Sequence, residues 1–126
     1  MEKSNNKHVP NMRGKWNTTA SILTRNSLNE RPSFDNIQKI SFPSEIEQKD
    51  QFLIINEATT TRIGVLNYLN NTWTITIADD DDNGTSVLVP RCPGNYDVWV
   101  GSYTESGFDD IPEQAQVVGT VKLKRE

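Results

Sequence analysis

The sequence predicts an all-β protein, a single antiparallel up-and-down β-barrel of about eight strands, with a β-sandwich as the alternative. Short stretches of alternating apolar and polar residues recur along the chain between turn sequences, which is the pattern of antiparallel sheets. No stretch has the 3.6-residue period of a helix of ordinary length. With 126 residues, of which 34% are hydrophobic and 24% charged, the chain is long enough for one core and one domain.

The first segment shows no periodicity. Residues 1–12 are polar and are expected to form a flexible tail that becomes ordered only if something docks on it. The folded domain is therefore expected to span residues 13–126. The tail lacks the apolar run of a secretory signal, which favours a cytoplasmic location.

The strands are expected to follow one another through hairpin turns. In the first strand, alternate positions from Trp16 to Ile22 form the inward face. A loop at residues 26–33 precedes a long hairpin about Lys49-Asp50. Ser44 with Glu47 also fits a capping box, so one helical turn is the alternative for residues 44–48, and the extended interpretation is favoured. The predicted strands are 15–22, 36–48, 51–57, 62–69, 72–79, 86–90, 96–104 and 115–125.

A second hairpin is predicted at Asn70-Asn71, a two-residue connection whose residues tolerate positive φ. In its second arm, Trp73 and the two isoleucines that follow it alternate with threonines. This period of two indicates a half-buried strand with Trp73 facing inward.

Two features mark the ends of the predicted sheet: Gly14-x-Trp16 on the first strand and a basic residue, Arg125, near the end of the last. This pattern resembles the calycin superfamily, which comprises lipocalins, avidins and their relatives. In such barrels the Trp closes one end, and an Arg of the final strand packs across the indole in a cation–π contact of roughly 1 kcal/mol. Counting by twos from Val117 places Arg125 on the core face. The T-D-Y-type turn of lipocalins and the biotin-contacting pattern of avidins are absent.

This resemblance implies that Gly14, Trp16 and Arg125 form the barrel closure. It also implies a ligand cavity inside the barrel, although small closed barrels can fill completely with side chains.

Charge and cysteine content exclude several classes of function. The net charge of -4 and the pI near 5.0 provide no basic surface for phosphate backbones, so nucleic acid is not an expected partner. No run of about 18 apolar residues is present, so no membrane association is expected. Cys92 is the only cysteine, which rules out an intrachain disulfide and a thiolate metal cluster.

One acidic stretch resembles the opening of a calcium loop. Asp79, Asp81 and Asn83, followed by a glycine, supply oxygen ligands at alternating positions. The twelfth position is Pro90, where a bidentate Glu would be needed. The alternative is an ordinary acidic hairpin that turns at Asn-Gly. No other cofactor is expected.

Aromatic residues are the candidates for lining a small-molecule site, with core packing as the alternative for most of them. In the segment 96–103, the valines alternate with Trp99 and Tyr103, so this pair lies outside if the valines lie inside. An exposed pair would suit a carbohydrate or protein surface. The candidate ligand-binding residues are Trp16, Phe52, Tyr68, Trp73, Trp99 and Tyr103.

Catalysis is not expected. The sole histidine, His8, falls in the predicted tail, Cys92 falls in a Pro-flanked turn, and adjacent acids such as Asp109-Asp110 are usually only solvated. The sequence therefore favours a non-enzymatic barrel that holds a small, largely apolar ligand. The alternative is a sandwich or filled barrel that serves as a structural module or binds protein or carbohydrate. Self-association through a strand edge stays open.

Overall fold

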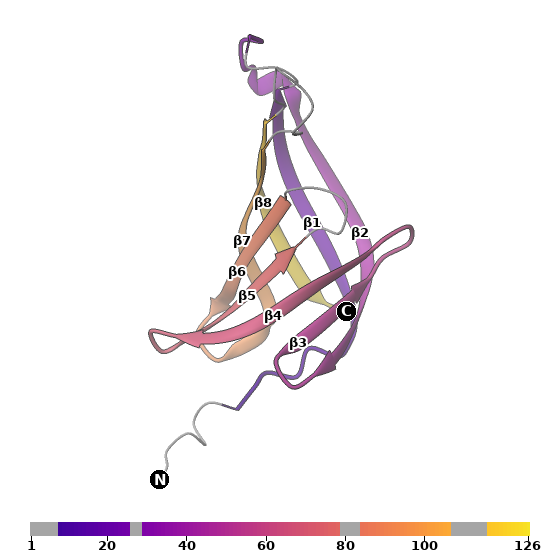
Figure 1. Ribbon diagram of the computed structural model, residues 1–126, viewed down its shortest axis with the longest axis vertical. Helices are drawn as coiled ribbons and strands as arrows, with labels where there is room; N and C mark the ends of the chain where they lie inside the picture. Colours follow the sequence, from indigo (N-terminus) through magenta and orange to yellow (C-terminus); the bar gives the residue numbers. More distant parts are fainter. Residues whose placement is uncertain (1–7, 26–28, 79–83, 107–115) are drawn as a thin grey trace.

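The protein is a closed eight-stranded barrel (Figure 1). A computed structural model describes residues 8–25, 29–78, 84–106 and 116–126. Each strand pairs antiparallel with its neighbours in sequence, and β8 pairs with β1 to close the sheet. The barrel prediction is confirmed, and the sandwich alternative is wrong. The elements are β1 (Gly14–Arg25), a 3-10 turn η2 (Phe34–Asn36), β2 (Ile37–Lys49), β3 (Phe52–Asn56), β4 (Thr61–Leu69), β5 (Thr72–Ala78), β6 (Gly84–Cys92), β7 (Asn95–Ser106) and β8 (Gln116–Arg125).

Both predicted hairpins are present. Asn70 and Asn71 have φ values of 53° and 62°, the left-handed geometry of the tight hairpin turn. The first hairpin turns one residue later than predicted, because Lys49 pairs with Phe52. Residues 44–48 belong to β2, so the alternative of a helical turn there is wrong.

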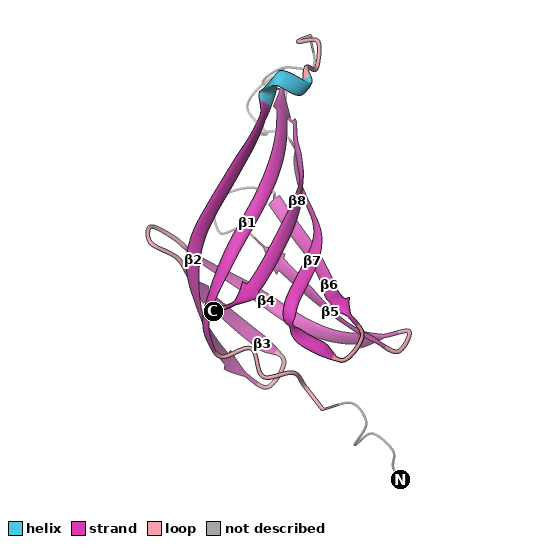
Figure 2. Ribbon diagram, turned by 180° about the vertical axis from the view of Figure 1, so that it is seen from behind, coloured by secondary structure: helices cyan, strands magenta, loops and turns pink. Residues whose placement is uncertain are grey.

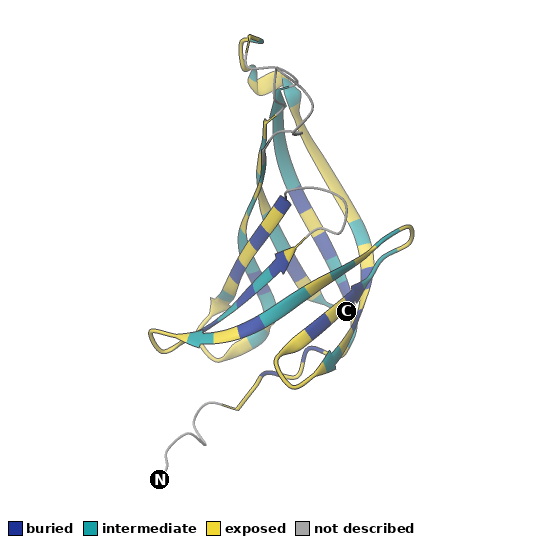
Figure 3. Cartoon of the chain, viewed as in Figure 1, coloured by how far each residue is buried: buried dark blue, intermediate teal, exposed yellow. Residues whose placement is uncertain are grey.

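Side chains of the core fill one end of the barrel. In Figure 3 the buried positions gather toward the end where the N- and C-terminal segments meet the sheet. Because side chains alternate across a strand, each strand contributes every second residue to this interior. The members of this packed floor are Met12, Trp16, Ile46, Leu53, Ile55, Leu66, Trp73, Ile75, Ile77, Leu88, Trp99 and Leu123.

Strand lengths leave the other end open. β1, β2 and β7 have 12, 13 and 12 residues, whereas β3 has five. β2 pairs with β3 only from Glu45 to Lys49, so its residues 37–44 have β1 as their one partner among the described strands. The long strands therefore rise beyond β3, and η2 joins β1 and β2 at their far end (Figure 2).

The segment that precedes β1 contacts the core of the barrel. Met12 is fully buried in the packed floor, and its carbonyl oxygen accepts a hydrogen bond of 2.7 Å from the indole N–H of Trp16. Its own N–H donates to Oε1 of Gln48 at 2.7 Å. A buried indole N–H needs an acceptor, and this segment provides it. Pro10 is buried as well, and its carbonyl accepts from Nε2 of Gln48, so residues 10–12 pack against the barrel, while residues 1–7 lie outside the described part.

Candidate functional site: the open half of the barrel

Above the packed floor lies an open cavity with a volume of about 590 Å³. It is bounded by inward-facing residues of β1, β2, β4, β6, β7 and β8 and by the β3–β4 connection. This volume lies within the range of pockets that hold small molecules. The described lining consists of Thr18, Ala20, Ile22, Thr24, Gln38, Ile40, Phe42, Glu57, Thr59, Thr60, Arg62, Ser86, Tyr103, Glu105, Val117 and Val121.

The apolar lining residues share one side of the cavity. All of them belong to the three adjacent strands β8, β1 and β2. We call this set the apolar wall: Ala20, Ile22, Ile40, Phe42, Val117 and Val121.

The remaining sides carry polar groups. In a closed ring of eight strands, β1 lies opposite β5, so the apolar wall faces β4, β5 and β6 across the cavity. The lining residues from the β3–β4 connection, β4, β6 and β7 all have a side-chain hydroxyl, carboxylate or guanidinium. We call this set the polar wall: Glu57, Thr59, Thr60, Arg62, Ser86, Tyr103 and Glu105.

A chain of hydrogen bonds runs along the lower part of the cavity. Nη2 of Arg62 donates to Oε2 of Glu57 at 2.6 Å, and these two side chains are only 13% and 7% exposed. The hydroxyl of Ser44 donates to the same carboxylate oxygen at 3.2 Å. The hydroxyls of Ser44 and Thr18 lie 3.2 Å apart. Because Ser44 donates to Glu57, the Thr18 hydroxyl donates to Ser44. The chain of bonds therefore connects β1, β2 and β4 through the β3–β4 connection.

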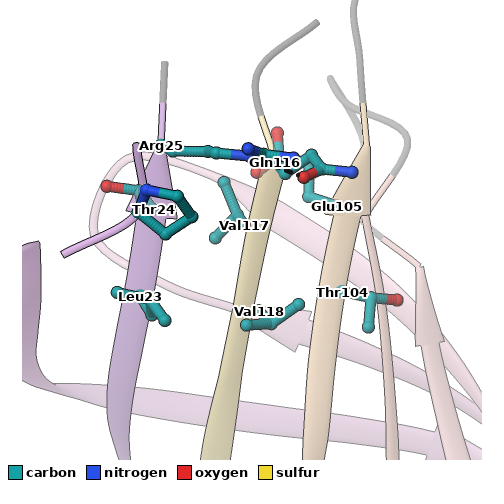
Figure 4. Close-up of a pocket in the computed structure, with 9 residues that line it drawn as sticks. Leu23, Thr24, Arg25, Thr104, Glu105, Gln116, Val117 and Val118 are labelled. Carbon is teal, nitrogen blue, oxygen red and sulfur yellow. Dashed lines mark hydrogen bonds between the residues drawn. The ribbon is translucent and has the colours of Figure 1, made fainter. Parts of the chain in front are cut away.

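Nearer the mouth, the hydroxyl of Tyr103 donates to Oε1 of Glu105 at 3.1 Å. A second hollow of about 300 Å³ lies at the ends of β1, β7 and β8 and shares Thr24, Glu105 and Val117 with the larger cavity (Figure 4). There, Nε of Arg25 donates to Oε1 of Gln116 at 2.9 Å. The mouth of the barrel is thus lined by charged and amide groups.

Arg125 and Trp16 are cross-strand partners of β8 and β1 and contact each other at the floor. The Arg125 guanidinium carbon lies 4.3 Å from the centre of the Trp16 ring. Its Nη1 donates to the Arg13 carbonyl at 2.9 Å, and its Nε donates to the Asp97 carboxylate at 2.8 Å. Gly14 lies beside it with a φ of 120°, a conformation that favours glycine. These contacts join the two chain ends.

Most of the predicted aromatic ligand residues lie in the packed floor instead of the cavity. Trp16, Trp73 and Trp99 are buried there, and Tyr68 packs on Trp73 with ring centres 5.2 Å apart. Of the six, Tyr103 alone belongs to the described lining of the cavity.

Two expectations about aromatic residues are wrong. Phe52 faces outward and is 68% exposed, because it alternates with the buried Leu53. The alternative in which Trp99 and Tyr103 lie outside fails as well. Trp99 is fully buried opposite Leu123, and the neighbouring Val98 and Val100 lie on the outer face.

The predicted calcium ligands Asp79, Asp81 and Asn83 lie outside the described residues. Within the part of the chain that the structure describes, no three His, Cys, Asp or Glu side chains come together as metal ligands. Cys92 is exposed at the end of β6, and His8 is exposed before the first strand.

Sequence reasoning missed the charged residues of the cavity. Arg62 occupies the first inward position of β4, two residues before Gly64 and four before the buried Leu66. The same parity that placed Trp73 inside would have placed Arg62 inside. Glu57 follows β3 in a connection without periodicity, so no pattern in the sequence could locate it.

Searches of known protein families and of curated proteins give no match to this chain. Among the described residues, no helix is both long and apolar enough to cross a lipid bilayer. The fold and the composition of the cavity are therefore the grounds on which a function can be argued.

Proposed function

We propose that this protein binds a small amphipathic molecule in the open half of a calycin-like barrel. The observation that carries the proposal is the cavity of about 590 Å³ above the packed floor, lined by an apolar wall and a polar wall. Ligand sites are concave and combine apolar surface with a few placed polar groups. A barrel whose only role was structural would gain stability by filling this volume with side chains.

The buried ion pair supports the same proposal. Removing the Arg62 guanidinium and the Glu57 carboxylate from water is costly, and a pair of apolar residues often gives equal or greater stability. A charged pair in the cavity wall is therefore better explained by recognition of a polar ligand group than by folding. This differs from the largely apolar ligand among Trp16, Phe52 and Trp73 that the sequence suggested.

The proposal is tested by filling the cavity. In Val121→Phe a larger side chain enters the apolar wall, whereas Val87→Phe makes the same change on the outer face of β6. We expect N-phenyl-1-naphthylamine to bind the unaltered protein and Val87→Phe with enhanced fluorescence. It should bind Val121→Phe at least tenfold more weakly, because the added ring occupies the space of the probe. Circular dichroism checks that both variants fold.

Equal binding by the two valine variants would contradict the proposal. Native mass spectrometry of the protein as purified provides a second readout, because a retained ligand would appear as an added mass that Val121→Phe lacks.

A second candidate function uses the outer surface. Phe52 and Ile63 are 68% and 64% exposed, and Phe52 lies beside Val65 and Ile54 beside Ile63 across β3 and β4. Apolar side chains gathered on one exposed face are typical of interaction surfaces. If this face mediates self-association, sedimentation velocity should show a concentration-dependent increase in mass that Phe52→Ser abolishes.

A further inference from the structure

The two walls of the cavity run side by side along the barrel axis instead of one above the other. Near the mouth, Glu105 of the polar wall is the cross-strand partner of Val117 of the apolar wall. Lower down, Tyr103 and Ser86 are cross-strand partners on the polar side. Near the floor, Arg62 and Glu57 belong to the same cavity as Phe42 and Val121. Each level of the cavity therefore has an apolar side and a polar side.

Three polar residues on the apolar strands do not disturb this division. Thr18 lies next to the floor and is engaged by Ser44. Thr24 and Gln38 lie toward the far ends of β1 and β2, at the mouth. Between them, the inward positions of β8, β1 and β2 present aliphatic and aromatic carbon to the cavity.

From this arrangement we infer that the ligand is facially amphipathic. It is a rigid ring molecule with hydrogen-bonding groups on one face and hydrocarbon on the other. The inference rests on the proposed function and specifies its ligand. A head-and-tail amphiphile such as a fatty acid would place its hydrocarbon chain against the carboxylates and hydroxyls of the polar wall. Covering these charged and hydroxyl groups with hydrocarbon removes the water that completes their hydration, and the chain offers no hydrogen bond in return, so the cavity discriminates against such a chain.

The inference can be tested with three probes that each carry one carboxylate. Their binding is measured by isothermal titration calorimetry at concentrations below those at which they form micelles. Cholate has three hydroxyls on one face of its ring system, 5β-cholanate has the same skeleton without hydroxyls, and dodecanoate is a linear chain. We expect cholate to bind about tenfold more tightly than either of the others, because only cholate satisfies both walls.

Two substitutions and a matched control test whether the two walls cause the preference for cholate. Tyr103→Phe removes one hydroxyl from the polar wall and should weaken cholate binding about three- to tenfold while leaving 5β-cholanate binding unchanged. Val121→Thr places a hydroxyl in the apolar wall and should weaken cholate binding by a similar factor. Val87→Thr makes the same change on the outer face of β6 and should have no effect.

The outcomes separate the inference from the proposal on which it rests. Tighter binding of 5β-cholanate or dodecanoate than of cholate would overturn the facial arrangement and leave a binding barrel. Failure of all three probes to bind would overturn the proposed function and the inference together. If Val87→Thr weakened cholate binding as much as Val121→Thr does, the ligand would lie outside the cavity, and both the inference and the proposed function would be contradicted.

Discussion

Arg125 lies where the two ends of the chain meet, and its guanidinium makes several contacts at once. It lies over the Trp16 ring, it donates to backbone carbonyls of Asn11 and Arg13, and it is paired with Asp97. The planar guanidinium can stack on an indole and donate from its edge at the same time, which an ammonium group cannot do. One side chain thereby holds the N-terminal segment, β7 and β8 together beneath the floor.

Replacing this residue should destabilise the barrel. We expect Arg125→Ala to lower the free energy of unfolding by about 2 kcal/mol, because the cation–π contact and hydrogen bonds to two carbonyls are lost together. Urea titration followed by tryptophan fluorescence measures the change. Lys124→Ala, on the exposed outer face one residue earlier, should change stability by less than about 0.5 kcal/mol. Similar losses in both variants would show that the closure contact contributes nothing specific.

At the scale of elements, the closeness of β6 and β7 depends on a glycine. A Cβ atom added at Gly101 would overlap the carbonyl oxygen of Val87 and the Cα of Leu88. The two strands therefore approach more closely there than any side chain allows, and the sheet can bend around the cavity. Gly119 has a similar contact with the Ser21 carbonyl on the other side of β8.

This close approach makes Gly101→Ala a severe substitution. Because the obstructing atoms belong to the backbone, relief requires the strands to separate, and we expect a loss of stability of about 3 kcal/mol or more. A thermal melt followed by circular dichroism at 218 nm would show the lowered midpoint. Ser102→Ala, the adjacent exposed position of β7, is the control and should melt close to the unaltered protein. An unchanged midpoint for Gly101→Ala would mean that β6 and β7 are not so close.

Strands could be predicted where apolar and polar residues alternate with a period of two and no other pattern fits the same residues. The parity of the last strand placed Arg125 on the core face, and Asn70-Asn71 fixed one hairpin through its positive φ values. Parity alone does not say which face of residues 96–103 is inward, and the pairing of Trp99 with the buried Leu123 decides it. Which face of a strand is inward depends on its pairing with strands that are distant in the sequence, and the local sequence does not determine that pairing.

The cavity was less predictable than the barrel. Its charged groups combine Arg62 of β4 with Glu57 of an irregular connection, and they meet across the short turn in which the Glu57 N–H donates to the Thr60 carbonyl. The burial of Met12 could not be predicted either. Its segment is polar and has no periodicity, so nothing in it indicates that the Met12 carbonyl accepts a hydrogen bond from the Trp16 indole.

On the scale of the whole molecule, stability and binding occupy different ends of the barrel. The packed floor contains the three tryptophans and most of the buried aliphatic residues, whereas the open half retains a volume of about 590 Å³ bordered by charges. Burial of apolar area at the floor is the main stabilising term, at roughly 25 cal/mol per Å². The open half is thus free to keep polar groups that contribute little to folding.

The most direct test is a titration of uniformly ¹⁵N-labelled protein with cholate, followed by backbone amide chemical shifts. A ligand held in the open half should move the amides of Ile22, Tyr103 and Val121 most, since these residues line the cavity on three different strands. The amides of Ile54 and Ile63 on the outer face should stay in place. Shifts centred on Ile54 and Ile63, with the cavity amides unmoved, would contradict a binding chamber inside the barrel.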